Sequence, residues 1–311
     1  MKKTALLCYN MYILQHKKQG SNCVMTYLLY NTHAGNQHVE QELDSLISSF
    51  QGNAEKKDVE TINYKTFIPT LTKEDTVILC GGDGTLNHFI NDTDGIDIEC
   101  DILYYPSGSG NDFANDIGCP AHDHPIPVKQ YFENLPLAEV KGKQYRFINN
   151  VGFGIDGYCC EVGDMLKEKS DKPVNYTAIA IKGLLFYYHP TNATVIVDGK
   201  KYEYKKVWLA PTMKGRYYGG GMIATPAQDR NDPDGKVSVM IFHGSSKLQT
   251  LMIFPSIFKG EHIKKEKYVT IHTGHEISVS FDRPASVQID GETILGVTEY
   301  CVKSKVPAKI S

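Results

Sequence analysis

The chain has 311 residues, 41% hydrophobic and 22% charged, which is ordinary for a soluble globular protein and long enough for two domains. A formal net charge of −3, without an RNP-like or helix-turn-helix signature, excludes a dedicated nucleic-acid-binding protein. No apolar run approaches the roughly 18 residues that a membrane-spanning helix needs.

Residues 1–24 are expected to form an N-terminal extension ahead of the folded chain. The stretch has a basic tip, but Asn10, Gln15 and His16 interrupt its apolar run and no small-residue cleavage pattern follows, so no signal peptide is expected. The eight cysteines form no CxxC pair and are too sparse for a disulfide scaffold. Reduced thiols and a cytoplasmic location are therefore expected.

Residues 25–138 predict an α/β domain, because apolar β-branched runs alternate with segments of helical periodicity. The expected strands are Met25–Tyr30, Asp58–Asn63, Thr76–Cys80 and Asp101–Tyr105. The expected helices are Val39–Phe50, Leu86–Ile90 and Phe113–Ile117. Strands that alternate with helices in this way favour a parallel sheet.

The third expected strand runs into TVILCGGDGTLN, residues 76–87, which is typical of a phosphate-binding loop. Tandem glycines let the backbone approach a phosphate closely, and the following helix N-terminus offers N–H groups to an anion. The carboxylate of Asp83 is suited to hold a magnesium ion or a water beside phosphates, and Thr85 and Asn87 supply side-chain donors. A structural turn with an Asx cap is the alternative, but the motif as a whole favours nucleotide binding.

Two further loops rich in Gly, Asn and Ser follow the first and fourth expected strands, at residues 31–35 and 106–112. In an open parallel sheet, the carboxyl ends of the strands share an edge, and ligands bind at that edge. The three loops therefore predict a single nucleotide site.

Residues 139–292 change to short strands with turn residues between them, which predicts an antiparallel, sandwich-like β domain. The expected strands are Tyr145–Asn150, Thr194–Val197, Lys206–Ala210, Lys236–Phe242, Tyr268–Ile271, Ile277–Phe281 and Ala285–Ile289. One helix is expected at Asn175–Tyr188.

Three segments of this second half have two interpretations each. Val151–Gly157 fits G-x-G-x-x-G, but Gly163 interrupts the next segment, so glycine-lined strand ends are favoured over a dinucleotide fingerprint. Asn231–Lys236 carries oxygen ligands for a hard cation, and a plain Asp-Gly turn explains it equally well. Asp290 and Glu292 lie on one side of a tight turn, where a carboxylate could accept a hydroxyl proton; a solvated turn is the alternative.

The segment Lys259–Lys267 is dense in lysine, and its simplest interpretation is a solvated face. The same lysines would suit contact with anionic lipid headgroups, which contributes about 1 kcal/mol for each lysine near a membrane surface. The candidates for such contact are Lys259, Lys264, Lys265 and Lys267.

The loops together resemble the diacylglycerol kinase catalytic-domain family, which includes bacterial diacylglycerol kinases and sphingosine kinases. The likeness runs from about Met25 to the C-terminus. Residues 81–87 match the family's GGDGTxN without change, and residues 106–112 match its P-x-G-T-x-N-D, with Ser109 in place of the threonine.

The first loop departs from the family pattern N-P-x-S-G. It keeps Asn31 and Gly35, but Thr32 and Ala34 replace the proline and the serine. One side-chain contact to the nucleotide is thereby lost from the pattern, whereas a backbone cradle is retained.

The resemblance implies a role for each matching residue. The positions that fall on the family's nucleotide contacts are Asn31, Thr32, His33, Ala34, Gly35, Thr66, Gly81, Gly82, Asp83, Gly84, Thr85, Leu86, Asn87 and Ser109. Asp290 and Glu292 fall on the family's D-G-E, whose acids accept the substrate proton, and Glu292 is favoured. The family's magnesium loop implies the Asp234 carboxylate with the carbonyls of Asn231 and Lys236 as ligands.

The resemblance therefore implies an ATP-dependent, Mg²⁺-dependent lipid kinase that phosphorylates diacylglycerol or a related lipid alcohol and feeds phospholipid metabolism. Such an enzyme is expected in the cytoplasm, associated peripherally with the inner face of the membrane, without a nucleic-acid partner. A homodimer is left open. The family also implies that residues 293–311 return to the first domain.

Three alternatives are weaker. NAD kinases share GGDGT but clamp the ribose with an Asn-Glu pair, and the chain has no Asn-Glu dipeptide. Phosphofructokinases share the glycines, yet the β-rich second half fits them poorly. The altered loop at 31–35 would suit a catalytically silent nucleotide- or lipid-binding homologue, but the intact Asp83, Asp290 and Glu292 argue against that interpretation.

Overall fold

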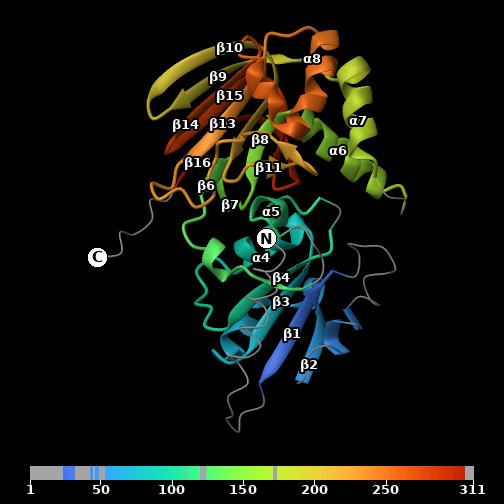
Figure 1. The fold of residues 1–311 in the computed structure, drawn as a ribbon, viewed down its shortest axis with the longest axis vertical. Coiled ribbons are helices and arrows are strands. Elements are labelled where there is room, and N and C mark those ends of the chain that lie inside the picture. Colours follow the sequence, from blue (N-terminus) through green and yellow to red (C-terminus); the bar gives the residue numbers. More distant parts are fainter. Residues whose placement is uncertain are drawn as a thin grey trace. The chain divides into compact units, whose positions relative to one another are not determined.

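The structure is a computed structural model that describes residues 24–31, 43–44, 46–48, 53–108, 110–119, 124–170 and 174–304. The chain divides between Glu133 and Asn134 into two compact units, called unit 1 and unit 2 here (Figure 1). The division falls shortly before residue 138, where the sequence pattern changes. Of the expected N-terminal extension, only Val24 belongs to the described residues.

Unit 1 is built on a five-stranded sheet in the order β2-β1-β3-β4-β5. Its strands are β1 (Met25–Tyr30), β2 (Asn53–Asp58), β3 (Thr76–Gly81), β4 (Asp101–Pro106) and β5 (Ile126–Pro127). The pairs from β2 to β4 are parallel, and the short β5 runs antiparallel to β4. The parallel sheet predicted from the alternation of strands and helices is therefore confirmed.

Every residue of the central strand β3 is buried, as expected for a parallel strand covered on both faces. Residues 43–44 and 46–48 are helical, and Leu43 packs in the core of this unit. The other helices are η1 (Val59–Thr61), α3 (Tyr64–Phe67), η2 (Ile68–Thr70), α4 (Asp83–Asp92), α5 (Asp112–Asp116) and η3 (Lys129–Tyr131).

The strand expected at Asp58–Asn63 is wrong. β2 ends at Asp58, whose carboxylate accepts the N–H of Glu60 and caps η1. The side chain of Asn63 accepts the N–H of Lys65 and caps α3. Asp and Asn side chains stabilise helix starts in this way, so short helices follow Asp58, the first residue of the expected segment.

Unit 2 is built on a nine-stranded sheet in which every pair is antiparallel. The strands along its main path are β14 (Val269–Gly274), β13 (Val237–His243), β10 (Lys200–Met213), β8 (Asn150–Gly154), β15 (Glu276–Ile289), β16 (Glu292–Lys303), β6 (Leu137–Val140) and β7 (Lys143–Arg146). β9 (Thr191–Val197) pairs with β10 and β15. A separate two-stranded ribbon joins β11 (Tyr217–Tyr218) and β12 (Met222–Ile223).

The antiparallel second domain is therefore confirmed, with one strand misplaced. The strand expected at Tyr145–Asn150 is divided between β7 and β8. The core of the sheet includes the fully buried ring of Phe153, which stacks on Phe281 with 4.4 Å between centroids.

The helices of unit 2 are α6 (Ile155–Lys167), α7 (Tyr176–Lys182), the π-helix η4 (Gly183–Tyr187), α8 (Lys247–Ile253), η5 (Phe254–Lys259) and η6 (Glu261–Lys264). Figure 1 shows α6, α7 and α8 side by side beside the sheet. The helix expected at Asn175–Tyr188 corresponds to α7 and η4. Gly163 does not interrupt α6; a Cβ there would lie 2.6 Å from the ring of Tyr176, so the glycine lets α7 pack closely.

The C-terminal strand corrects one expectation. Residues 292–303 form β16, which pairs with β15 and β6 inside the sheet of unit 2. This part of the segment 293–311 therefore does not return to unit 1, because its backbone hydrogen bonds complete the second sheet. Residues 305–311 lie outside the described residues.

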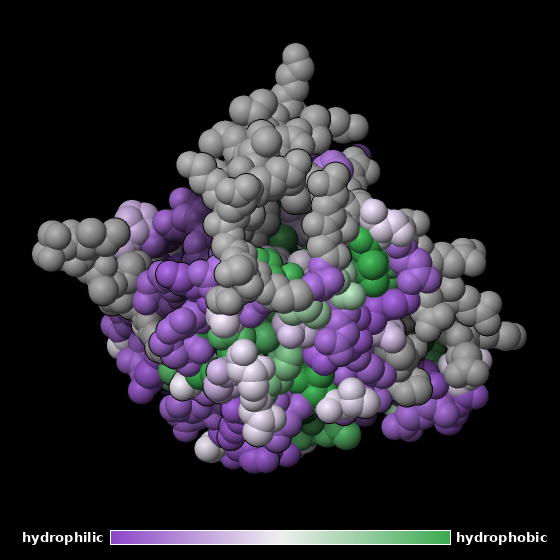
Figure 2. Space-filling model, turned by 90° about the horizontal axis from the view of Figure 1, so that it is seen from below, coloured by the Kyte–Doolittle hydropathy of each residue, from purple (hydrophilic) through white to green (hydrophobic). Residues whose placement is uncertain are grey.

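In the view from below Figure 1, the described residues form a mainly hydrophilic surface with small hydrophobic areas between (Figure 2). Among the described residues, no helix has both the length and the hydrophobicity that crossing a bilayer requires.

Candidate functional site

The loop between β3 and α4 leaves no room for side chains. A Cβ on Gly81 would lie 2.1 Å from Oγ1 of Thr85, and a Cβ on Gly108 would lie 2.5 Å from Cα of Gly82. The N–H of Ser107 also donates to the Gly81 carbonyl at 3.0 Å. Two of the three loops that the sequence places at one sheet edge are therefore in direct backbone contact.

Asp83, the first residue of α4, connects these two loops. Its Oδ2 accepts the N–H of Asp112 and its Oδ1 accepts the N–H of Phe113, each at 2.9 Å, so its carboxylate binds the start of α5. Burial and, next, the charge of Asp83 raise the pKa of Tyr104 well above its ordinary value. Both carboxylate oxygens thus contact backbone amides, where the motif predicts a bound magnesium ion or water.

Asn111 shapes the second loop. It adopts a left-handed conformation, with φ of 49°, immediately before α5. Its Nδ2 donates to the Gly108 carbonyl at 2.7 Å, and Asn115 donates to the Gly110 carbonyl at 3.1 Å. Asn111 and Asn115 therefore bond the backbone carbonyls of this loop. Ser109 lies outside the described residues.

The remaining motif residues of α4 have different surroundings. Gly82, the N-cap residue of α4, has no side chain with which to cap the helix, and a helix start of this kind suits an anion. Leu86 is fully buried in the core, and Asn87 is 7% exposed and accepts Nδ2 of Asn91 at both its oxygens. These two residues anchor the helix behind the loop.

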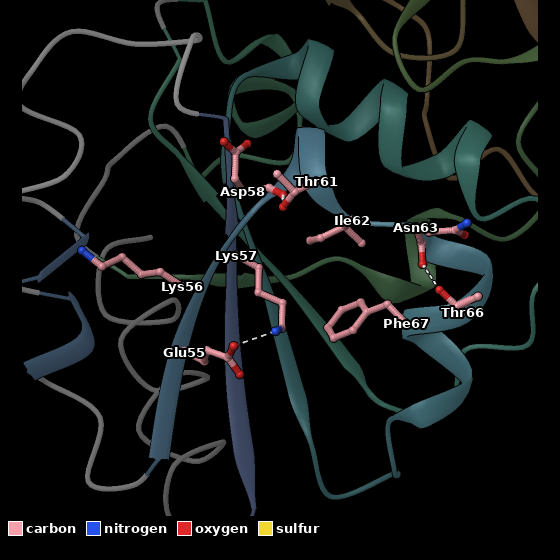
Figure 3. A pocket seen from close by; sticks show the side chains of 9 residues that line it. All are labelled: Glu55, Lys56, Lys57, Asp58, Thr61, Ile62, Asn63, Thr66 and Phe67. Atoms are coloured by element: carbon pink, nitrogen blue, oxygen red, sulfur yellow. Dashed lines mark hydrogen bonds and ion pairs between the residues drawn. The ribbon is translucent and has the colours of Figure 1, made fainter.

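Thr66 lies in a surface pocket of unit 1 of about 400 Å³ (Figure 3). The pocket is lined by Glu55, Lys56, Lys57, Asp58, Thr61, Ile62, Asn63, Thr66 and Phe67. Thr66 Oγ1 donates to the Asn63 carbonyl at 3.0 Å, and Nζ of Lys57 lies 5.6 Å from the ring centroid of Phe67. The ammonium group of Lys57 and the ring of Phe67 thus line the same pocket as Thr66, the predicted nucleotide contact.

The first loop is described only at Asn31, directly after β1. The predicted contacts Thr32, His33, Ala34 and Gly35 lie outside the described residues. Their roles stay predictions.

In unit 2, the hairpin between β15 and β16 separates the two candidate acids. The carboxylate of Asp290 accepts the N–H groups of Ile148, Asn149 and Asn150 at 2.7–2.8 Å, and Asp290 is 7% exposed. Glu292 starts β16 and is exposed. Asp290 therefore holds the hairpin against the start of β8, and Glu292 is the better placed of the two to receive a proton.

The glycine-rich segment at 151–157 contains an acid that the sequence analysis did not select. Asp156 is buried in the first turn of α6, and burial raises its pKa to about 6. Its Oδ1 has no hydrogen-bond partner among the described residues. The dinucleotide fingerprint is excluded, because β8 lies in an antiparallel sheet whereas that motif needs a parallel βαβ unit.

The metal-ligand role of Asp234, Asn231 and Lys236 stays a prediction. The Asp234 carboxylate pairs with Nζ of Lys236 at 2.8 Å, and the Lys236 carbonyl accepts Nε2 of Gln228 at 3.0 Å. The N–H of Asn231 donates a hydrogen bond to the Asp229 carboxylate. No group of three or more His, Cys, Asp or Glu side chains in the described part of the chain is arranged to hold a metal ion.

Comparisons with known proteins follow the same division of the chain. Residues 25–137 match the "Diacylglycerol kinase catalytic domain" family, and residues 149–309 match the "YegS C-terminal NAD kinase beta sandwich-like domain" family. A Mycobacterium tuberculosis protein named diacylglycerol kinase is 27% identical over 76% of this chain and 74% of its own length. A Staphylococcus aureus protein, named provisionally as a lipid kinase, is 28% identical over 86% of this chain and 90% of its own.

Two crystal structures of Bacillus anthracis proteins have a similar fold. One, described provisionally as a diacylglycerol kinase, has a TM-score of 0.65 at 17% identity and covers 93% of this chain and 94% of its own. The other, described as a diacylglycerol kinase, has a TM-score of 0.57 at 16% identity and covers 92% and 95%.

Asp83→Asn should weaken the connection between the two phosphate-loop segments. The variant keeps one acceptor oxygen but turns an NH₂ group toward a backbone N–H, which leaves a buried donor unsatisfied. We expect a loss of about 1–3 kcal/mol in unfolding free energy together with weaker ATP binding, measured by urea unfolding and calorimetry. Asp97→Asn, at an exposed position of the same unit, should change neither quantity. An unchanged stability of Asp83→Asn would contradict the structural role.

Asp156 should make stability depend on pH. Because its folded pKa of about 6 exceeds the ordinary aspartate value of 3.8, the native state binds more protons between these values. The unfolding free energy should therefore fall as pH rises from about 4 to 6, by roughly 3 kcal/mol, relative to Asp156→Asn. Unfolding of both proteins in urea from pH 4 to 7 measures the difference. A difference that is flat with pH would mean that the carboxyl group is solvated.

Proposed function

The chain belongs to the family that joins a diacylglycerol kinase catalytic domain to a YegS C-terminal β-sandwich-like domain, and from this membership we propose its reaction. It is a diacylglycerol kinase-like lipid kinase. We propose that it transfers the γ-phosphoryl group of ATP to the hydroxyl of diacylglycerol or a related lipid alcohol. The acceptor oxygen bonds to the γ-phosphorus, the bond to the β,γ-bridging oxygen breaks, and ADP leaves. The product would supply phospholipid metabolism.

The observation that carries ATP use is the open start of α4. Gly82 and Gly108 approach each other closely because neither has a side chain, and Gly82 as the N-cap residue has none with which to cap the helix. A phosphate oxygen satisfies such N–H groups and is favoured by the helix dipole. The β- or γ-phosphate of ATP is the ligand that fits this site in a kinase.

Mg²⁺ belongs to the proposal as the ion that accompanies ATP in phosphoryl transfer. We propose the Asp234 carboxylate and the carbonyls of Asn231 and Lys236 as its ligands, as the family's magnesium loop implies. Asp83 also contacts backbone amides through both carboxylate oxygens.

Glu292 is the proposed base that accepts the proton of the acceptor hydroxyl. It is the exposed acid of the D-G-E hairpin, whereas Asp290 is occupied by three backbone amides. A carboxylate within reach of the hydroxyl accepts its proton as the new bond to phosphorus forms.

The lipid nature of the acceptor is supported by the helical face of unit 2. Large apolar side chains are exposed there on neighbouring helices: Met165, Leu166, Tyr176, Ile181, Leu185, Phe186, Tyr187, Leu248, Met252, Phe258 and Ile263. We call these residues the apolar face. An extended exposed apolar surface of this kind marks a protein or membrane contact. Exposed lysines of η5 and η6 lie beside it, which suits an anionic bilayer.

An NAD kinase-like activity is the second candidate, because the matched β-sandwich-like family carries that name. The chain lacks the Asn-Glu dipeptide of NAD kinases.

A direct assay separates the candidates: the purified chain receives Mg²⁺, γ-labelled ATP and, in parallel, diacylglycerol, other lipid alcohols or NAD. Transfer of label to a lipid is expected. Transfer to NAD and to no lipid would overturn the proposal, and transfer to no acceptor would favour a silent homologue.

Glu292→Gln should lower kcat by about 10²–10⁴, with unchanged ATP affinity and unfolding free energy, because the side chain is exposed and its shape is kept. Glu203→Gln, at another exposed glutamate of unit 2, is the matched control and should keep full turnover. Steady-state kinetics with dispersed diacylglycerol measures both. Near-full turnover of Glu292→Gln would place the base elsewhere. Asp290→Asn cannot replace this test, since it also removes an acceptor for backbone amides.

The apolar face should be needed for activity on diacylglycerol in bilayers and not for activity on diacylglycerol dispersed in detergent. In the double variant Phe186→Ser and Leu248→Ser, two side chains that are 65% and 68% exposed lose their apolar surface. We expect activity to fall on vesicles of diacylglycerol and phosphatidylglycerol and to stay constant on detergent-dispersed diacylglycerol. Charge reversal at Lys259, Lys264, Lys265 and Lys267 should act in the same direction. Leu295→Ser, at a 57% exposed leucine of β16, is the control. Equal losses in both assays would exclude a docking role.

A further inference from the structure

The glycines of the G-x-G-x-x-G segment leave space for the carboxyl group of Asp156. A Cβ on Gly152 would lie 3.0 Å from Oδ2 of Asp156, and a Cβ on Gly154 would lie 3.2 Å from its Oδ1. A Cβ on Gly157 would lie 2.0 Å from the carbonyl oxygen of Ser286 in β15. A strand and a helix that lack these side chains can enclose an acid between them. Close packing around Asp156 therefore explains the glycine pattern.

The side chain of Gln288 connects Asp156 to the turn of the D-G-E hairpin. Gln288 is 3% exposed, and its Nε2 donates to Oδ2 of Asp156 at 3.4 Å. Its Oε1 accepts the N–H of Gly291 at 2.9 Å. With a pKa of about 6, Asp156 is ionised at neutral pH, and an ionised carboxylate only accepts hydrogen bonds. It therefore binds the NH₂ group of Gln288 and leaves the amide oxygen for the backbone N–H of the turn.

The conformation of this turn determines where Glu292 begins. Asp290 and Gly291 form the turn, and both have positive φ, 48° and 98°. Two-residue turns of this kind suit the twist of a β-hairpin. Ile289 pairs with Glu292 across the turn. The backbone of Glu292 thus follows directly from the residue whose N–H Gln288 accepts.

Helix α6 also bonds to the residue on the other side of Glu292. Thr293 donates from Oγ1 to Oδ2 of Asp164 at 2.8 Å. Asp156 and Asp164 both belong to α6. The residues before and after the proposed base are therefore both connected to one helix, the first through Gln288 and the second directly.

A buried acid at the place of Asp156 is unfavourable for stability. Burial raises its pKa, and its Oδ1 has no hydrogen-bond partner among the described residues. The groups whose pKa its charge raises are thiols and phenols, which are neutral at pH 7: Cys159, Cys160, Tyr188 and Tyr300. An apolar side chain would fill such a place at lower cost. Acids retained in spite of burial are concentrated at functional sites.

We propose that Asp156 and Gln288 are positioning residues for Glu292, and that together they fix the turn from which this base reaches the acceptor hydroxyl. The role of Glu292 as base rests on the proposed function. In this arrangement Asp156 acts on Gln288, and Gln288 acts on the N–H of Gly291. All of these contacts lie within unit 2.

Hydrogen exchange at the Gly291 amide tests the turn in the full-length chain without turnover. Gln288→Met removes the acceptor of this N–H, so NMR should measure exchange about 10-fold faster, the scale of one lost hydrogen bond. Asp156→Leu removes the partner of Gln288 and should act in the same direction. Asp156→Asn keeps an oxygen that can accept the same bond, so it should exchange at the wild-type rate. Unchanged exchange in Gln288→Met and Asp156→Leu would overturn the inference.

Turnover on detergent-dispersed diacylglycerol tests the effect on Glu292. We expect Gln288→Met to lower kcat by about 10–100-fold, the scale for a misplaced catalytic group. The KM for MgATP should not change, because the nucleotide motifs belong to unit 1. Gln288→Met combined with Glu292→Gln should be no slower than Glu292→Gln alone, since positioning has no effect once the base is gone. Additive losses would assign Gln288 a general structural role and contradict the proposal.

Gln249→Met is the matched control. Like Gln288, Gln249 accepts a backbone N–H through Oε1, that of Ser246 at 2.9 Å, and it donates from Nε2 to the Tyr268 hydroxyl at 3.0 Å. Loss of these bonds should lower the thermal midpoint, while kcat in detergent and exchange at Gly291 stay unchanged. An equal loss of kcat in both glutamine variants would show that turnover follows stability, which would exclude a positioning role.

The two readouts separate this inference from the proposed function. A wild-type chain that phosphorylates no lipid would count against the proposed function, and exchange at Gly291 would still decide whether Asp156 and Gln288 fix the turn. Wild-type turnover with an unchanged kcat of Gln288→Met would count against the positioning role alone. If Gln288→Met does not fold, Asp156→Leu is compared with Asp156→Asn in its place by the same criteria.

Discussion

The candidate site depends on one carboxylate that is bonded to backbone amides. Asp83 lies at the start of α4 and accepts two N–H groups from the start of α5, 29 and 30 residues further along the chain. Such charge-assisted bonds are short and strong, and they fix the loop after β3 to the loop after β4. The close approach of Gly82 to Gly108 is possible only because both lack a side chain. The open helix start of α4 is a product of this arrangement.

The same physical device recurs in unit 2. Asp290 accepts three backbone N–H groups at the start of β8, so its charge is satisfied by the protein itself. The D-G-E motif therefore divides its two acids between tasks: Asp290 positions the hairpin, and Glu292 is left exposed. The motif thus contains one acid that is bound by backbone amides and one exposed acid, which is the base that we propose.

Unit 2 also retains a carboxyl group whose charge burial disfavours. Oδ1 of Asp156 has no hydrogen-bond partner in the described chain. Its charged form lowers stability, since a buried charge is stable only with donors or an opposite charge. Groups of this kind concentrate at functional sites, where a substrate supplies the missing partner. The apolar face also exposes hydrophobic side chains to water, and contact with a membrane or a protein would remove this unfavourable exposure.

The sequence by itself determined the fold class, the parallel sheet with its glycine loops and the change to antiparallel strands, because these follow from local periodicity and from the steric freedom of glycine. It also determined the family resemblance, which depends on short contiguous motifs. Only the tertiary structure decided that Asp83 contacts α5, that β16 completes the second sheet and that Asp290 reaches Ile148, 142 residues earlier. A residue's partners across strands depend on register and packing between distant segments, and no local pattern of residue types encodes them.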